Sequence, residues 1–280
     1  MLKKNKKIII FGSKGFLASN LIKELKKEKV NFIDLSKKKI DLLKTNDCKK
    51  IPSYINQNDT LIFISAIAPV KDFKSFDKNI QMVCNFLNSV EHIKINHLIY
   101  VSSDAVYSDS VKSLKENSET LPDNLHGLMH ITREYLFKNS IKNLSIVRPT
   151  LIYGINDPHN GYGPNSFYRM ASKNLDIKLF GKGEELRDHV HISDVSEAIY
   201  KIADKRKMGI YNLCSGKVIS FFEIAKIIIN ETKSKSKIVF SKRKGLMPHN
   251  GYRAISNFKV KNIINKKFLS FKKGVSKFQK

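Results

Sequence analysis

The fold is decided by the stretch Lys7-Ile8-Ile9-Ile10-Phe11-Gly12-Ser13-Lys14-Gly15-Phe16-Leu17-Ala18. Four apolar residues of a type that favours strands end at Gly12, and apolar side chains recur at helical spacing after Gly15. A strand, a glycine-rich turn and a helix start, in that order, let backbone N–H groups face a dinucleotide pyrophosphate. The spacing is Gly-x-x-Gly-x-x-Ala, with Ala18 where a third glycine is usual. We predict that Gly12, Ser13, Lys14, Gly15, Phe16 and Leu17 contact this cofactor.

A carboxylate ends the next apolar run. The run covers 30–33, and Asp34 follows the turn by about 20 residues, a spacing at which a carboxylate binds both ribose hydroxyls. NAD is therefore the predicted cofactor, because a carboxylate repels the 2′-phosphate of NADP. Lys37, Lys38 and Lys39 follow closely, so NADP stays open as the alternative. A strand-end turn residue is the structural alternative for Asp34.

Length and composition fit one large domain or two closely joined domains, since the chain has 280 residues. The longest apolar stretch, 61–70, is about half of what a membrane-spanning helix needs, and no signal-peptide pattern opens the chain. We expect a cytoplasmic protein with no membrane partner. The three cysteines are isolated and lack metal spacing, so neither a disulfide framework nor a metal site is expected.

The formal net charge of +26 favours an anionic partner such as nucleic acid. The lysines, however, are distributed over every segment and form no single stripe, which is typical of a solvated surface. We therefore expect no nucleic-acid partner, and binding of a polyanion or RNA remains an alternative.

The alternation of strand and helix patterns along the chain predicts an α/β protein with a doubly wound parallel sheet, the Rossmann arrangement. Apolar runs alternate with helical patterns, the runs at 8–11, 30–33, 61–64, 97–101 and 144–147, the helices near 16–27, 79–93 and 126–139. Beyond Pro149 a glycine- and proline-rich stretch, a turn at 181–183 and a helix at 221–229 indicate a smaller, interleaved substrate lobe. We predict a nucleotide-binding domain over 1–153 with 185–213, and the lobe over 154–184 and 214–280.

Three further motifs follow in order. They are Tyr100-Val101-Ser102-Ser103-Asp104-Ala105-Val106-Tyr107, His126-Gly127-Leu128-Met129-His130-Ile131-Thr132-Arg133-Glu134 and Arg187-Asp188-His189-Val190-His191-Ile192-Ser193-Asp194-Val195. With the glycine turn, they make nearly the whole chain resemble the extended short-chain dehydrogenase/reductase family, the NAD-dependent nucleotide-sugar epimerases and dehydratases.

The resemblance implies roles for individual residues. Ser103 would hydrogen-bond the sugar oxygen. The implied cofactor contacts are Asp41 and Leu42 at the adenine, Ser65, Ala66 and Ile67 after the run 61–64, Asn79 on the helix behind them, and Pro149 beside the nicotinamide. The implied substrate contacts are Thr150, Asn165 and Arg187, with Arg243 and Arg253 as candidates for a second arginine. An arginine suits a nucleotide diphosphate because its planar fork donates two parallel hydrogen bonds. A local ion pair within 184–188 is the structural alternative for Arg187.

The chain departs from the family at its Tyr-x-x-x-Lys pair. His126 and His130 occupy the two positions. In the family, the lysine lowers the pKa of the tyrosine, which removes a hydroxyl proton as hydride leaves for the nicotinamide. A histidine performs acid/base chemistry near neutral pH without a lysine, since its ordinary pKa is about 6.5. It is shorter than tyrosine, so a water is expected to bridge His126 to the sugar, and His130 has to replace the lysine's ribose contacts.

Two histidines at i, i+4 also fit a metal, but Gly127 stands where the zinc helix carries glutamate, so no metal is expected. His189 and His191 alternate with apolar residues, and we expect them to be solvent-facing or hydrogen-bonded.

The leading hypothesis is therefore an NAD-dependent enzyme that acts on a nucleotide-sugar by transient oxidation, as an epimerase, dehydratase or reductase. Ser103, His126 and His130 would be its catalytic residues. The alternative is a catalytically silent protein that binds NAD or a nucleotide-sugar. Members of the family often form dimers through paired helices, so a homodimer stays open.

Overall fold

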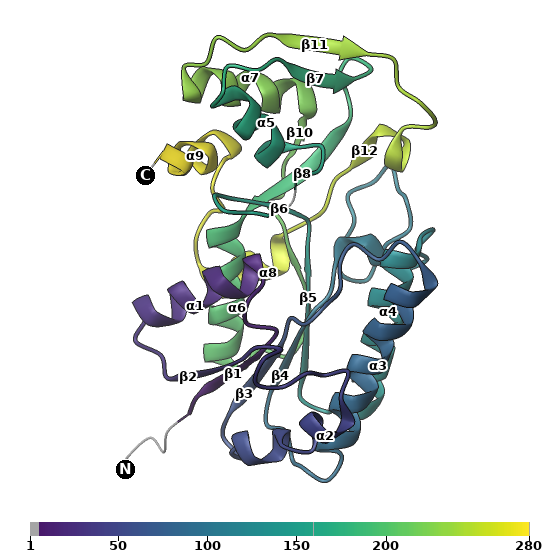
Figure 1. Ribbon diagram of the computed structural model, residues 1–280, viewed down its shortest axis with the longest axis vertical. Coiled ribbons are helices and arrows are strands. Elements are labelled where there is room, and N and C mark those ends of the chain that lie inside the picture. The colour runs from purple at the N-terminus through teal and green to yellow at the C-terminus, as the bar shows by residue number, and fades with distance from the viewer. Residues whose placement is uncertain (1–5, 159, 280) are drawn as a thin grey trace. The chain divides into compact units, whose positions relative to one another are not determined.

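The computed structural model describes residues 6–158 and 160–279 and divides the chain into two compact units (Figure 1). Unit 1 comprises residues up to 108, with 116–149 and 196–211, and unit 2 comprises 109–115, 150–195 and 212 onward. The boundaries differ from the predicted ones. Residues 185–195, expected in the nucleotide-binding domain, belong to unit 2, and so does the short segment 109–115.

Unit 1 is built on a six-stranded sheet in the order β2-β1-β3-β4-β5-β9. The strands are β1 (Ile8–Phe11), β2 (Phe32–Leu35), β3 (Thr60–Phe63), β4 (Leu98–Val101), β5 (Leu144–Pro149) and β9 (Gly209–Leu213). Neighbours from β2 to β5 pair in parallel. Strands β1, β3 and β4 are buried throughout, which explains why they appear as continuous apolar runs. The predicted doubly wound sheet is confirmed.

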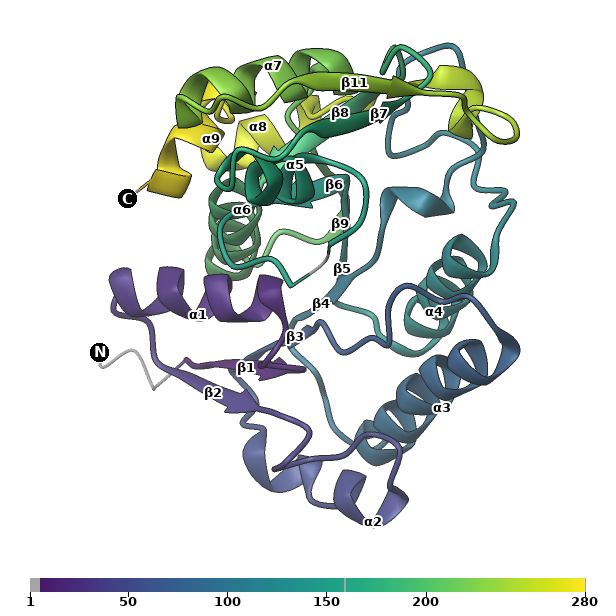
Figure 2. The same cartoon turned by 45° about the horizontal axis from the view of Figure 1, so that its top comes forward.

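Helices cover both faces of this sheet (Figure 2). Helices α3 (Phe73–Val90) and α4 (Leu125–Ser140) lie side by side on one face, and α1 (Phe16–Lys27) lies on the other. Helix α6 (Ile192–Lys205) runs from unit 2 into unit 1, and α2 (Thr45–Cys48) is a single turn. Helix α3 begins before the predicted residue 79 because Asp72 and Ser75 form a capping box there. Four aromatic rings pack against one another between the sheet and helices α3 and α4. They are Phe11 of β1, Phe63 of β3, Phe86 of α3 and Phe137 of α4.

Unit 2 contains two small sheets. In the first, β8 (Leu186–His191) pairs with β6 (Leu151–Tyr153), β10 (Val218–Ser220) and β12 (Tyr252–Arg253). In the second, β7 (Ile177–Phe180) pairs with β11 (Ile238–Ser241) in parallel. The helices are α5 (Pro164–Ala171), α7 (Phe221–Thr232), α8 (Phe258–Ile264) and α9 (Phe271–Val275). Tyr153, Phe167 and Phe221 belong to an apolar core of their own.

Among residues 6–158 and 160–279, none of the helices is long and apolar enough to cross a membrane. The cysteines Cys48, Cys84 and Cys214 form no disulfide, and Cys48 and Cys214 are buried.

Candidate active site

The turn after β1 requires its first glycine. Gly12 has a φ of +92°, which side-chain-bearing residues rarely adopt. A Cβ atom built there would lie 2.7 Å from Oγ of Ser65 and 2.8 Å from its Cα. The segment that follows β3 therefore approaches the turn too closely for any side chain at Gly12, and Ser65 lies directly against this glycine.

The second glycine leaves space for a ligand. A Cβ at Gly15 would meet only the Gly12 carbonyl oxygen, 4.0 Å away. Gly15 is also the N-cap of α1, where no side chain caps the helix and no acidic residue lies in the first turn. The Oγ atom of Ser13 is buried and has no hydrogen-bond partner among the described residues. Free helix N–H groups, an open approach and a buried hydroxyl donor suit the pyrophosphate of a dinucleotide.

A pocket of about 230 Å³ in unit 1 brings together seven of the predicted cofactor contacts, namely Gly12, Gly15, Asp41, Leu42, Ser65, Ala66 and Ile67. The pocket also contains Lys37, one of the lysines that kept NADP open. Sequence reasoning missed the other lining residues, which are Phe11, Leu35, Ile40, Leu43, Ile64 and Met82. Several of these follow or end a strand, and that position was the signal available, because ligands of doubly wound sheets sit at the carboxyl ends of strands. The mostly apolar walls fit an adenine ring.

Asp34 lies at the end of β2 and is about half exposed. Its Oδ1 accepts a hydrogen bond from Nζ of Lys39 at 2.9 Å. Lys39, one of the three lysines that kept NADP open, therefore forms an exposed ion pair with the predicted ribose-binding carboxylate. Asp41 shapes the next turn, since its Oδ1 accepts from the backbone N–H of Leu43 at 3.1 Å.

Asn79 positions the loop after β3. Its side chain is fully buried, accepts a hydrogen bond from the N–H of Ile67 at 3.0 Å and donates to the Ile67 carbonyl at 2.9 Å. The Arg133 guanidinium, also fully buried, donates to the carbonyls of Asn79 and Ser65. Asn79 thus acts on the cofactor pocket through Ile67. Two other predicted cofactor contacts are buried. Leu17 is a core residue in the first turn of α1, and Pro149 lies at the end of β5.

Ser103 follows β4 and caps the short 3₁₀ helix at Asp104–Val106, where its Oγ accepts from the N–H of Ala105 at 3.1 Å. Ser103 therefore has a structural role as a capping hydroxyl at the end of a strand. This role is compatible with catalysis, because the hydroxyl can still donate its proton while the oxygen caps the turn.

Helix α4 is docked against this turn through Gly127. A Cβ there would lie 2.1 Å from the carbonyl oxygen of Ala105 and 2.6 Å from Cβ of Pro122. Only glycine allows this approach, which holds the start of α4, including His126, next to the turn capped by Ser103. The structure thus brings two of the predicted catalytic residues into one region of unit 1.

His126 is an uncharged base at neutral pH. Burial lowers its pKa, and the nearby Asp104 carboxylate opposes that change. Its Nδ1 accepts a long hydrogen bond, 3.5 Å, from the backbone N–H of Val70. The ring of His130 lies at 90° to it, with centroids 4.8 Å apart.

His130 does not replace the positive charge of a lysine. It is 5% exposed, and burial, followed by the charges of His126 and Arg133, lowers its pKa well below the ordinary value. Its Nδ1 lies 2.8 Å from the hydroxyl of Tyr100. A hydroxyl that donates in this contact leaves the ring proton on Nε2, from which a neutral His130 can donate to a ribose oxygen.

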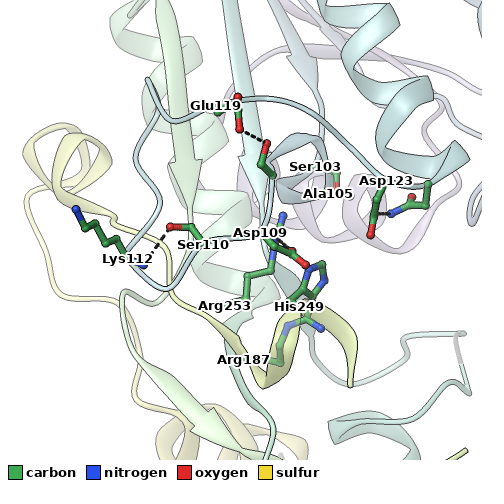
Figure 3. A network of polar contacts seen from close by, with 12 residues as sticks. Ser103, Ala105, Asp109, Ser110, Lys112, Glu119, Asp123, Arg187, His249 and Arg253 are labelled. Atoms are coloured by element: carbon green, nitrogen blue, oxygen red, sulfur yellow. Dashed lines mark hydrogen bonds and ion pairs between the residues drawn. The ribbon is translucent and has the colours of Figure 1, made fainter. Parts of the chain in front are cut away.

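The candidate arginines of unit 2 form two ion-paired groups. Glu185 bridges the first, with Oε1 3.0 Å from Nη1 of Arg187 and Oε2 3.6 Å from Nη1 of Arg243. The local ion pair considered for Arg187 is therefore confirmed. In the second, Asp109 contacts both His249 and Arg253, and Nη1 of Arg253 lies 3.1 Å from its Oδ1 (Figure 3).

Thr150 and Asn165 make contacts inside unit 2. Oγ1 of Thr150 donates to Asp188 at 3.1 Å, and Oδ1 of Asn165 accepts from the N–H of Gly154 at 3.3 Å. Asp188 was missed by the sequence analysis. It also accepts from Ser215 and from the backbone N–H groups of 216 and 217, and so ties β8 to that loop.

These features define a dinucleotide-binding protein of the Rossmann type with an appended unit. The chain belongs to the NAD dependent epimerase/dehydratase family, whose model matches residues 8–214.

Similar proteins span nearly its full length. The UDP-N-acetyl-alpha-D-glucosaminuronate decarboxylase of Bacillus cytotoxicus is 27% identical over 292 aligned positions, covering 91% of this chain and 88% of the relative. Among solved structures, the UDP-glucose 4-epimerase of Thermus thermophilus in complex with NAD superposes with a TM-score of 0.82 at 18% identity, covering 96% of each chain. The dTDP-4-dehydrorhamnose reductase of Bacillus anthracis in complex with NADP has a TM-score of 0.82 at 20% identity and covers 98% of each chain.

Proposed function

We propose that this protein is an NAD-dependent enzyme that transiently oxidises a nucleotide-linked hexose and completes an epimerisation or dehydration. In the remaining case, a net reduction, a reduced nicotinamide cofactor would deliver hydride to a keto-sugar and leave oxidised. The main support is the turn after β1. Ser13 and the uncapped start of α1 can donate hydrogen bonds to an anion there, and Gly15 leaves space for it. When bound, NAD would accept a hydride from the sugar and return it. The names of similar proteins support a UDP- or dTDP-linked sugar as substrate.

The chain's own residues would handle the sugar oxygen and its proton. Ser103 donates a hydrogen bond that orients the oxygen. His126 is neutral at pH 7, as a general base must be. While its Nδ1 accepts from Val70, the ring proton resides on Nε2, so accepting the sugar's proton at Nε2 requires moving the ring proton to Nδ1. The 3.5 Å contact with Val70 is weak, and breaking it opposes this shift little.

A second candidate function is binding without chemistry. It is favoured by the charge state of the pair, since His130 is buried and neutral where the family uses a lysine cation. Such a protein would sense NAD or a nucleotide-sugar.

The cytoplasmic location and the homodimer stay predictions.

The experiment that separates the two is turnover by wild type and His126→Tyr with NAD and UDP-hexoses. Absorbance at 340 nm detects net transfer of hydride from the sugar to NAD, the same measurement started with NADH detects net reduction of a sugar, and product NMR detects redox-neutral cycles. Turnover that falls in the variant supports His126 as the acid/base group. A silent wild type and an active tyrosine variant would establish a binding protein. Failure of wild type to bind either NAD or a nucleotide-sugar contradicts both functions.

A further inference from the structure

A second pocket, of about 610 Å³, lies within unit 2. It is lined by β10, by the start of α7 and by the segment that connects α8 to α9. Its walls are largely apolar and include Ile219, Ile227 and Phe271. Among the described residues that line it, none belongs to the candidate cofactor, catalytic or substrate residues.

One residue that lines the pocket has a buried polar atom without a partner. His189 on β8 is 4% exposed and lines this pocket, with its ring edge-on to Phe221 and Phe271. Its Nδ1 lies 3.3 Å from the Arg187 carbonyl oxygen, which only accepts, so Nδ1 carries the proton. Nε2 is then an acceptor, and it has no hydrogen-bond partner among the described residues.

The ring stays neutral in this surrounding, because burial lowers the pKa of His189 to about 3. An unpaired buried acceptor is unfavourable, and a ligand that brings an O–H or N–H group to Nε2 removes that penalty. His189 was expected to be solvent-facing or hydrogen-bonded. It is buried, with a hydrogen bond at Nδ1 and no partner for Nε2 among the described residues. His191 is also buried, and its Nδ1 lies 2.7 Å from Oγ of Ser193.

The exposed rim of the pocket is cationic. Lys217, Lys261, Lys267 and Lys272 line it, against a single acidic side chain, Glu223. The Glu223 carboxylate is occupied at the start of α7, where it accepts from the N–H and Oγ of Ser220 at 3.1 and 2.8 Å. Lys272 also lies 3.7 Å from Glu231. The lysines therefore outnumber the acids at the entrance and favour an anion there.

We propose that this pocket binds a small organic anion with an apolar body, whose hydrogen-bond donor reaches His189 Nε2 while its anionic group meets the lysine rim. The class includes hydroxylated or amino-substituted aromatic carboxylates, sulfonates and phosphates. This site goes beyond the proposed function, because it uses no residue of the proposed reaction.

The probe that tests it is 1-anilinonaphthalene-8-sulfonate, which combines an aromatic body, one N–H and one sulfonate. Its fluorescence is titrated with NAD and UDP-glucose in excess, so that binding at the nucleotide cleft is suppressed. We expect one saturable site that weakens as salt is added. N-phenyl-1-naphthylamine, the same molecule without the sulfonate, is expected to bind at least several-fold more weakly.

Variants locate the site. Lys217→Gln/Lys267→Gln is expected to weaken binding of the sulfonate by about tenfold. Lys178→Gln/Lys182→Gln removes the same charge from exposed positions of unit 2 outside the pocket and is expected to leave it unchanged. His189→Phe removes the acceptor and keeps a ring of similar volume, with an expected loss of about fivefold.

Equal affinity in the two double-lysine variants, or equal binding of the neutral analogue, would overturn the anion site. Unchanged affinity in a folded His189→Phe would overturn the role of His189. The lysine variants change only exposed side chains, so the proposal remains testable if the histidine variant does not fold. Loss of catalysis in the turnover experiment leaves these outcomes unaffected.

Discussion

The side chain of Lys39 donates a hydrogen bond to the Asp34 carboxylate, Nζ to Oδ1, at 2.9 Å, and a second to the Asp34 carbonyl at 3.0 Å. The pair stands at the end of β2, where the cofactor ribose is predicted to bind. The carboxylate can accept from the ribose hydroxyls of NAD, and the ammonium can meet the 2′-phosphate of NADP. The balance between these two charges is therefore expected to set the cofactor preference.

We predict that Asp34→Ala weakens NAD binding by about tenfold and improves NADP binding, because it removes the acceptor and frees Lys39. Lys39→Ala should have the opposite effect on NADP. Calorimetric titration of both cofactors measures the change, and Lys94→Ala, which removes an exposed lysine elsewhere in unit 1, is the control. An Asp34→Ala protein with unaltered affinity for both cofactors would place the ribose elsewhere.

Substitutions of the two glycines of the turn are expected to have different effects on stability and on cofactor binding. Gly12→Ala is expected to lower the free energy of unfolding by about 3 kcal/mol, since its Cβ collides with the backbone of Ser65 at a φ of +92°. Gly15→Ala is expected to change stability by less than about 1 kcal/mol, because its Cβ meets open space.

The same substitution at Gly15 should weaken NAD binding by about tenfold, as the new methyl group occupies space beside the phosphates. Urea unfolding and a cofactor titration on both variants provide the comparison. If Gly15→Ala bound NAD as well as wild type, the pyrophosphate would not approach this turn.

Local patterns made much of unit 1 predictable. The strand before Gly12 and the spacing to Gly15 predicted the turn, because neighbouring residues alone determine a strand-turn-helix junction. The Glu185–Arg187 pair was predictable for the same reason, since its partners are two residues apart. The start of α3 was misplaced because a capping box, and not apolar spacing, begins that helix.

Contacts between residues far apart in the sequence could not be predicted. Arg253 meets Asp109 across 144 positions, and Leu114 forms an isolated bridge with Ile255, which draws 109–115 into unit 2. No spacing rule joins such segments. Burial was equally hidden, since His189 lies on a strand with alternating polarity yet is covered by aromatic rings from other elements.

A buried ion pair ties β5 to α4. Glu134 is fully buried, and its oxygens accept from Arg148 at 2.8 and 2.6 Å and from Oγ of Ser102 at 2.7 Å. We predict that Glu134→Gln lowers the free energy of unfolding by about 3 to 5 kcal/mol, because it leaves the Arg148 charge buried without a counterion.

Lys138→Gln is the matched control. Its Nζ lies 3.3 Å from the same carboxylate but is partly exposed, so an effect below about 1 kcal/mol is expected in the same urea experiment. Equal effects of the two substitutions would show that Arg148 finds another partner or reaches water.

The last prediction concerns the pH dependence of stability. His97 is fully buried, with Nε2 2.8 Å from Oγ of Ser145, and burial, assisted by the charges of Arg206 and Lys6, lowers its pKa to about 4. An unfolded histidine has a pKa of about 6.5. As the pH falls below 6.5, His97 therefore becomes protonated in the unfolded chain but not in the folded protein. The free energy of unfolding decreases until the pH reaches the pKa of His97 in the folded protein.

Denaturant unfolding between pH 7 and pH 4 should accordingly show a steeper decline for wild type than for His97→Gln, by roughly 1 kcal/mol per pH unit within that window. His92→Gln removes an exposed histidine and should leave the slope of wild type unchanged. Parallel curves for wild type and His97→Gln would mean that the folded protein protonates His97 as readily as the unfolded chain does. Since the ring is enclosed at the start of β4, that result would require water to enter the sheet beside Ser145.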